Sequence, residues 1–366
     1  MHRKIFPLFL AGAPLSLYSA FFALAVLLSR ISPKKIIFEM TRAKNALVYL
    51  CIALLLFTFA IWENPELLRL SGLIITTLIL SIAVDHFRFA SSFKIFVDFA
   101  FWLHITAIAL SIILDDPLLL DGNEVPGRFG GFIGYDFVSF FIASYLVMQL
   151  SQDAKRLHIM TYVKLGLGVI AIVQSGRFGY VNLAILFGYV LLSHVGLKKT
   201  IFAVTVGAFS LYFFREKLVF VYVSFQFFFM EILGAEVNYD VLESPDGYYG
   251  QSFRRFIEEA ERLSTVTLAP SFRQSFEVVD SGIVNTLGAA GWLLGSLVIL
   301  GYGRFVNFSS LHTGALSLIL IATDLKFRCF YSPFPMLWFF IMLKVMSDKP
   351  SVVRRKLDYP KRGRPA

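Results

Sequence analysis

The feature that most constrains this chain is the recurrence of apolar stretches about as long as a lipid bilayer is thick. Four of them fall within the first third of the sequence, at residues 5–28, 46–62, 67–84 and 93–114. Crossing hydrocarbon takes roughly 20 residues of helix, and a helix satisfies its own backbone hydrogen bonds there. Only 16% of the 366 residues are charged, against roughly 25% in soluble domains. These features predict an all-α, polytopic membrane protein.

The distribution of basic residues predicts which loops face the cytoplasm, because such loops are rich in lysine and arginine. The loop after the first apolar block carries Arg30, Lys34 and Lys35, whereas the next connection carries Glu63 and Glu66. Continuing this alternation gives about eleven spans with the basic tail inside and the N-terminus outside. The later spans are predicted at residues 130–150, 160–174, 178–195, 200–214, 282–301, 311–325 and 331–345. The first block is interpreted as a retained anchor, because it is longer than the apolar core of a signal peptide.

The apolar segment 218–233 is an ambiguous point in this topology. Counting it as a span would place the long segment 234–280 inside and the basic tail outside, against the charge rule. We therefore interpret it as an interfacial or re-entrant helix on the outer leaflet. The resulting organisation is a transmembrane domain over residues 1–346, with a large periplasmic loop at about 215–280, and a basic cytoplasmic tail over 347–366.

The net charge of +9 does not indicate a nucleic-acid partner, because much of the excess lies in the tail. A basic segment beside the last span is typical of contact with anionic membrane lipid. The two cysteines, Cys51 and Cys329, lie in or beside spans and imply no disulfide framework. No cluster of carboxylates or histidines has the spacing of a metal site.

The predicted outer side carries arginines against the positive-inside trend. The long segment contains Arg254, Arg255, Arg262 and Arg273 and no lysine, while Arg128 and Arg177 lie at the outer ends of predicted spans. A guanidinium grips a phosphate with two parallel hydrogen bonds. An arginine set on this side therefore suits a diphosphate-linked lipid substrate.

Some of these arginines also have a simpler explanation. The stretch 251–263 has helical periodicity, and on it Glu258 and Glu259 follow Arg254 and Arg255 by four residues. Such pairs are common on a solvated helix face. Arg273 has Glu277 in the same relation, whereas Arg128 and Arg177 have no such acid.

The acidic residues and the one mid-span histidine leave several alternatives open. Asp280 precedes a predicted span, where it serves either as a helix cap or as a catalytic base. Asp98 and Asp136 lie within spans, where carboxylates usually face an interior cavity. His104 is expected to be a packed neutral imidazole rather than a ligand. The glycines around residue 130 are best explained by close helix packing.

Three short motifs carry a resemblance to a known family. They are RFGGFIG from Arg128, QSGRFG around Arg177, and DSGIVNTLGAAGWLLG from Asp280. In their order and sidedness they resemble the O-antigen polymerases (Wzy-type), within the wider group that includes the O-antigen ligases. The resemblance covers roughly residues 125–300.

The resemblance implies a membrane-embedded glycosyltransferase of the bacterial inner membrane that acts on its periplasmic face. Such an enzyme moves a glycan from an undecaprenyl-diphosphate donor to another lipid-linked repeat unit. Arg128, Arg177, Arg254, Arg255 and Arg273 would hold the diphosphate. Asp280, or in second place Glu277, would accept the proton of the acceptor hydroxyl.

The implied reaction needs no cofactor, because diphosphate is already a good leaving group. Its partners would be the lipid-linked oligosaccharide, membrane lipid, a chain-length regulator and a flippase. Polymerase is favoured over ligase, because a ligase is expected to carry a histidine near the end of the large loop, and residues 234–280 contain none.

Two other classes of function compete with this hypothesis. A transporter or flippase of lipid-linked saccharide would typically show inverted repeats with matching broken helices, whereas the halves of this chain differ. The other rival is an inactive structural partner in a polysaccharide-assembly complex.

Overall fold

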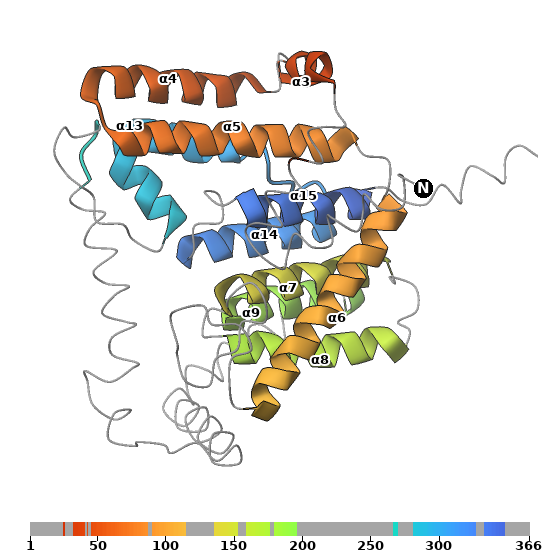
Figure 1. Cartoon of the computed structure of the whole chain (residues 1–366). Helices are drawn as coiled ribbons and strands as arrows, with labels where there is room; N and C mark the ends of the chain where they lie inside the picture. The colour runs from red at the N-terminus through yellow and green to blue at the C-terminus, as the bar shows by residue number, and fades with distance from the viewer. Residues whose placement is uncertain are drawn as a thin grey trace, which may run out of the picture.

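The computed structural model is all-helical throughout the part of the chain that it describes. That part comprises residues 25, 32–40, 42, 45–86, 90–114, 135–152, 159–175, 179–195, 266–269, 281–326 and 333–347. No strand occurs in these ranges. The elements are α3 (Pro33–Met40), α4 (Ala46–Trp62), α5 (Pro65–His86), α6 (Ala90–Leu114), α7 (Tyr135–Gln152), α8 (Ile159–Ser175), α9 (Gly179–Val190), η3 (Leu191–Val195), α13 (Gly282–Tyr302), α14 (Leu311–Lys326) and α15 (Pro333–Ser347) (Figure 1). The predicted helical class is confirmed.

Two described helices, Pro65–Asp85 and Gly282–Tyr302, are long and apolar enough to cross a membrane. Shorter apolar helices accompany them, among them Ala46–Ile61, Phe137–Gln152 and Pro335–Ser347. Buried helices of soluble proteins can meet the same criteria. Length and composition therefore fit membrane association, but they do not give the number of membrane crossings. The number of spans and the large loop depend on residues outside the described ranges and stay predictions.

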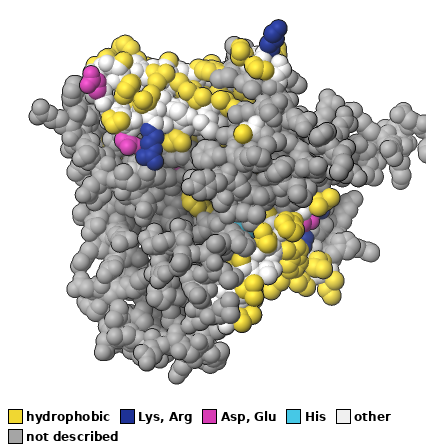
Figure 2. All heavy atoms as spheres, viewed as in Figure 1, with side chains coloured by type: hydrophobic (Ala, Val, Ile, Leu, Met, Phe, Trp, Pro, Cys, Tyr) yellow, Lys and Arg dark blue, Asp and Glu magenta, His cyan; other side chains and the backbone are white. Residues whose placement is uncertain are grey.

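Apolar side chains cover both the inward and the outward faces of several helices. On α4, Val48 and Leu55 are buried, while Leu50 is 51% exposed and Phe57 65% exposed. Figure 2 shows hydrophobic side chains spread along the outward face of α4, at the top of the molecule. A helix that is apolar all round is typical of a membrane span or a fully enclosed core. These outward apolar faces suit contact with lipid.

The turn between α4 and α5 shows how local sequence sets the helix ends. Glu63 adopts a left-handed conformation with φ of 51°, and its N–H donates to the Phe59 carbonyl at 2.7 Å. Asn64 then accepts the Glu66 N–H at 3.0 Å through its side-chain oxygen. Pro65 opens α5, the position at which proline loses no helical hydrogen bond. The turn therefore joins two antiparallel helices with few residues.

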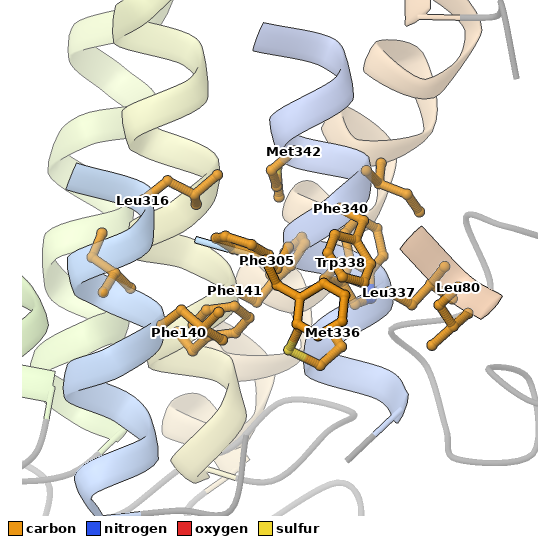
Figure 3. Packing of buried hydrophobic residues seen from close by; sticks show 14 of the residues in the cluster. Leu80, Phe140, Phe141, Phe305, Leu316, Met336, Leu337, Trp338, Phe340 and Met342 are labelled. Atoms are coloured by element: carbon orange, nitrogen blue, oxygen red, sulfur yellow. The ribbon is translucent and has the colours of Figure 1, made fainter. Parts of the chain in front are cut away.

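The core draws on most of the described helices, and Figure 3 shows the part of it where α5, α7, α14 and α15 meet. Trp338 on α15 is 1% exposed and meets Phe141 on α7 edge to face, with ring centroids 4.9 Å apart. Phe305 packs against Phe340 in the same way at 5.8 Å. Edge-to-face pairs add about 0.5–1.5 kcal/mol to the burial of each ring. These aromatic contacts hold α15 against α7 and against the turn that follows α13.

Contacts between helices show which helix ends share a side of the bundle. Lys344 near the end of α15 donates to the Asp85 carbonyl near the end of α5 at 3.1 Å. Tyr189 near the end of α9 hydrogen-bonds His312 at the start of α14 at 2.7 Å. We name the end where α4 meets α5 the outer end, after the loop charges, and the opposite end the inner end. The directions of these four helices agree with the predicted alternation.

Candidate functional site

The candidate site lies at the outer end, where the helices that follow the three family-like motifs begin. Every residue proposed for it from the sequence lies outside the described ranges: Arg128, Arg177, Arg254, Arg255, Arg273, Glu277 and Asp280. The structure does describe the helices that lie next in the sequence to three of them, Arg128, Arg177 and Asp280. Tyr135 opens α7, Ser175 ends α8 before Gly179 opens α9, and Ser281 precedes α13.

A buried hydrogen-bonded group joins two of these helices, α7 and α9, to α14 near the outer end. Asn182 on α9 has no exposed surface, and its amide nitrogen lies 3.2 Å from the Ser139 hydroxyl of α7 and 3.4 Å from the Thr323 hydroxyl of α14. Thr323 also donates to the Ile319 carbonyl of its own helix at 2.7 Å. Buried polar groups need such partners, since an unmade hydrogen bond in the interior is costly. The contacts therefore hold the starts of α7 and α9 beside the end of α14.

Asp324 is the buried carboxylate of this region. It follows Thr323 on α14 and is completely buried. Its carboxylate lies against Gly282, the first residue of α13, so closely that a Cβ at residue 282 would lie 2.7 Å from both Asp324 Cγ and Asp324 Oδ2. We call Ser139, Asn182, Thr323 and Asp324 the outer polar cluster. Through Asp324 the cluster extends to α13, the helix that follows Asp280.

The N-cap of α13 is Ser281. Its side chain accepts a hydrogen bond from the Val284 N–H at 3.3 Å, and its φ and ψ of −69° and 125° are those of a capping residue. Of the two roles open to Asp280 in the sequence, capping of α13 is thus filled by its neighbour. The catalytic role of Asp280 stays a prediction.

The helix α13 is broken at Gly291, within the third motif. Gly291 has φ of 73° and ψ of 170°, a conformation that only glycine adopts readily. The predicted span 282–301 is therefore two helical segments. They fold closely on each other, because a Cβ on Gly295 would lie 3.0 Å from the Leu287 Cα.

A short piece of the predicted large loop occupies the break. The Trp292 N–H donates to the Thr267 carbonyl at 3.0 Å, and the Leu293 N–H to the Leu268 carbonyl at 3.1 Å. These amides begin a helical segment, so they have no partner within it. The segment 266–269 supplies the partners and ties this part of the loop to α13.

Asp98 and His104, both on α6, lie away from the outer polar cluster, whereas Asp136 lies at the start of α7, three residues before Ser139. Asp98 on α6 accepts hydrogen bonds through one oxygen from Tyr145 on α7 and from Lys164 on α8, the latter at 3.1 Å. His104 is completely buried with its ring 5.3 Å from that of Phe141, in line with the expected packed imidazole. Asp136 lies on α7, and its side chain is outside the described part.

The position of the Asp98 pair distinguishes it from the candidate site. Lys164 lies near the start of α8 and Asp98 in the first half of α6, so both belong to the inner half of the bundle. Asp98 thus meets a charged partner, and its side chain is 29% exposed. Within the described ranges, no three His, Cys, Asp or Glu side chains are grouped to hold a metal ion.

Comparison with known proteins gives no relative. No family model matches the chain, and no curated protein and no solved structure matches it. The function therefore has to be argued from the residues and their arrangement alone.

Sequence reasoning missed the outer polar cluster, including its carboxylate. Asp324 lies inside the apolar block 311–325, and a carboxylate in such a block is itself a signal of function. Ser139, Asn182 and Thr323 give a weaker signal. Small polar residues are frequent in membrane helices, and a hydroxyl can bond to its own helix.

Proposed function

We propose that this chain is a polysaccharide polymerase that joins undecaprenyl-diphosphate-linked oligosaccharide repeat units on the periplasmic face of the bacterial inner membrane. One observation carries the proposal. The three motifs that resemble the O-antigen polymerases lead into α7, α9 and α13, and the starts of these helices meet at the outer polar cluster. Segments far apart in sequence thus lead into a common end of the bundle.

The proposed reaction is a direct glycosyl transfer. A hydroxyl oxygen of the acceptor sugar bonds to the anomeric carbon of the donor sugar, and the bond from that carbon to the lipid diphosphate breaks. The hydroxyl proton passes to the carboxylate of Asp280, with Glu277 as the second candidate. The negative charge that develops on the diphosphate is balanced by Arg128, Arg177 and the loop arginines, which act by preorganised electrostatics.

The directions of the described helices are those that the proposal requires. α9 starts at the outer end beside Ser139 and Thr323, and α13 starts beside Asp324 at the same end. Because α9 ends at the inner end and α13 starts at the outer end, the chain between them has to return to the outer end. In a membrane this requires an odd number of crossings. The proposed topology has one crossing there, at residues 200–214, and places 218–233 on the outer leaflet.

A direct test is reconstitution of the purified protein in liposomes with lipid-linked repeat units as the only substrate. Products of two, three and more repeats on one lipid, with release of undecaprenyl diphosphate, are expected. In cells, deletion should leave single repeats on the surface glycan. Wild-type protein that is folded and yet makes no product longer than one repeat would contradict the proposal.

A flippase of lipid-linked saccharide is the second candidate, because of the charged pair in the inner half. Ionisable residues within membrane helices often mark transport pathways, and the buried Lys164 contacts the partly exposed Asp98 at 3.1 Å. A flippase predicts that a deletion strain displays no surface glycan at all. It also predicts movement of labelled lipid-linked saccharide across protein-containing liposomes without any change in chain length.

A further inference from the structure

The carboxylate of Asp324 is enclosed at the junction of two helices. It has no exposed surface, so a bulky lipid-linked saccharide does not reach it in this arrangement of the chain. Its immediate neighbour across the junction is Gly282 of α13, with Asp324 Oδ2 and Cγ each 2.7 Å from where a Cβ would lie. A side chain at residue 282 would therefore require the Asp324 carboxylate to move. The carboxylate and the start of α13 therefore determine each other's position.

The end of α14 that carries Asp324 is itself fixed in the bundle. The preceding residue, Thr323, lies 3.4 Å from the Asn182 amide nitrogen, which in turn lies 3.2 Å from the Ser139 hydroxyl. Two helices, α9 directly and α7 through Asn182, thus hold the end of α14, and Asp324 extends this hold to a third, α13. A rigid supporting shell is what keeps reacting groups within the narrow geometric tolerance of catalysis.

Charge favours the same contact. The first turn of a helix presents the positive end of its dipole, and a carboxylate beside it is stabilised. Ser281 satisfies the Val284 N–H, while the Asp324 carboxylate lies at the first residue, Gly282. The serine cap and the carboxylate from α14 act together on one turn of helix.

We propose that Asp324 is a positioning residue for the polymerisation reaction, which holds the first turn of α13 through Gly282. This inference rests on the proposed function. By fixing that turn, Asp324 fixes the direction in which the chain enters α13, immediately after the proposed base Asp280. It acts through this helix and does not itself touch the substrate.

The contact is tested by a double-mutant cycle on thermal unfolding of the purified protein. Gly282→Ala should lower the melting temperature, because its methyl group meets the carboxylate. In the background of Asp324→Ala the same substitution should lower it less than half as much, since the carboxylate is gone. Full additivity of the two substitutions would show that the groups are independent and would overturn the proposed contact.

The positioning role is tested by steady-state kinetics in liposomes, well below the melting temperature of each variant. Asp324→Asn keeps the shape of the side chain and removes its charge. We expect kcat to fall about tenfold or more, with KM for the lipid-linked repeat within about twofold, because substrate binding is unchanged and only alignment is lost. If the asparagine variant does not fold, Gly282→Ala replaces it, because this substitution disturbs the same contact from α13. It should likewise lower kcat while leaving KM nearly unchanged.

Asp98→Asn is the matched control, because it removes an intramembrane carboxylate from the inner half of the bundle. Its kcat per folded molecule should stay within about twofold of the wild-type value. Wild-type kcat in folded Asp324→Asn, or a rise in KM alone, would overturn the positioning role while leaving the polymerase proposal intact. Absence of any polymer from folded wild-type protein would instead overturn the polymerase proposal and this role with it.

Discussion

At the scale of single residues, the structure gives Ser281 the capping role that the sequence left open to Asp280. Ser281 is buried and caps α13 through the Val284 N–H at 3.3 Å. Asp280 is one residue further from the helix, so its carboxylate is not required for that cap. Removing one side chain at a time should therefore give two different phenotypes.

We predict that Ser281→Ala destabilises the protein and that Asp280→Asn inactivates it. Loss of a serine cap costs about 1 kcal/mol, so Ser281→Ala should lower the melting temperature while retaining long glycan chains. An amide cannot accept the acceptor proton, and loss of a general base typically costs about 100- to 10,000-fold in rate. Long chains from well-expressed Asp280→Asn would remove Asp280 from the site and direct attention to Glu277. The measurement is the glycan ladder beside a protein-level blot.

The geometry of the arginine side chain gives a second prediction at this scale. If Arg177 holds a diphosphate with two parallel hydrogen bonds, Arg177→Lys should fail nearly as badly as Arg177→Ala, since lysine keeps the charge without the fork. A lost charged hydrogen bond is worth roughly 1.5–3 kcal/mol, or at least about tenfold in activity. Arg304 is exposed in the turn after α13, near the inner end, so Arg304→Lys is the control and should have no effect. Full chain length with Arg177→Lys would show that charge alone matters.

At the scale of elements, the apolar blocks predicted the helices well, because hydrophobic length is a local property. α4 has its predicted bounds, and α5 extends the block 67–84 by two residues at each end. The break in α13 could not be predicted in this way. A glycine within an apolar stretch is equally consistent with close packing, and the partners of the Trp292 and Leu293 amides come from a segment about two dozen residues earlier. The break in α13 is therefore set by tertiary contacts rather than by local sequence.

Gly291 is therefore predicted to be the least replaceable glycine of the third motif. An alanine there would have to adopt a φ of 73° and ψ of 170°, at a cost of about 1–3 kcal/mol. Its Cβ would also lie 2.7 Å from the Ala269 carbonyl carbon. Gly291→Ala should lower the melting temperature and shorten the glycan chains. Gly188 on α9 has open space where a Cβ would be, so Gly188→Ala should be neutral or stabilising by up to about 1 kcal/mol. Equal effects of the two substitutions would contradict the role of the break.

At the scale of the whole molecule, the loop charges predict the sides of the helix ends, and two contacts join ends that are predicted to share a side. The Lys344 contact with Asp85 belongs to the inner end, and the Asp324 contact with Gly282 belongs to the outer end. Sequence could not foresee the outer polar cluster. Its members come from α7, α9 and α14, and no local pattern relates positions so far apart along the chain.

This arrangement predicts that the long segment 234–280 is accessible from outside and the basic tail from inside. Single cysteines placed at Pro245 and Pro360, in a variant with Cys51 and Cys329 replaced, should react with an impermeant thiol reagent from opposite sides of the membrane. Two exposed described positions calibrate the assay: Glu63 in the turn at the outer end and Ser309 in the turn at the inner end. Glu63→Cys should label in intact cells like Pro245→Cys, and Ser309→Cys only after permeabilisation, like Pro360→Cys. Because each crossing reverses the side, labelling of Pro360→Cys in intact cells and of Pro245→Cys only after permeabilisation would require an additional crossing before residue 234. The segment 218–233 would then be a full span, and the proposed loop would lie on the wrong side for lipid-linked substrates.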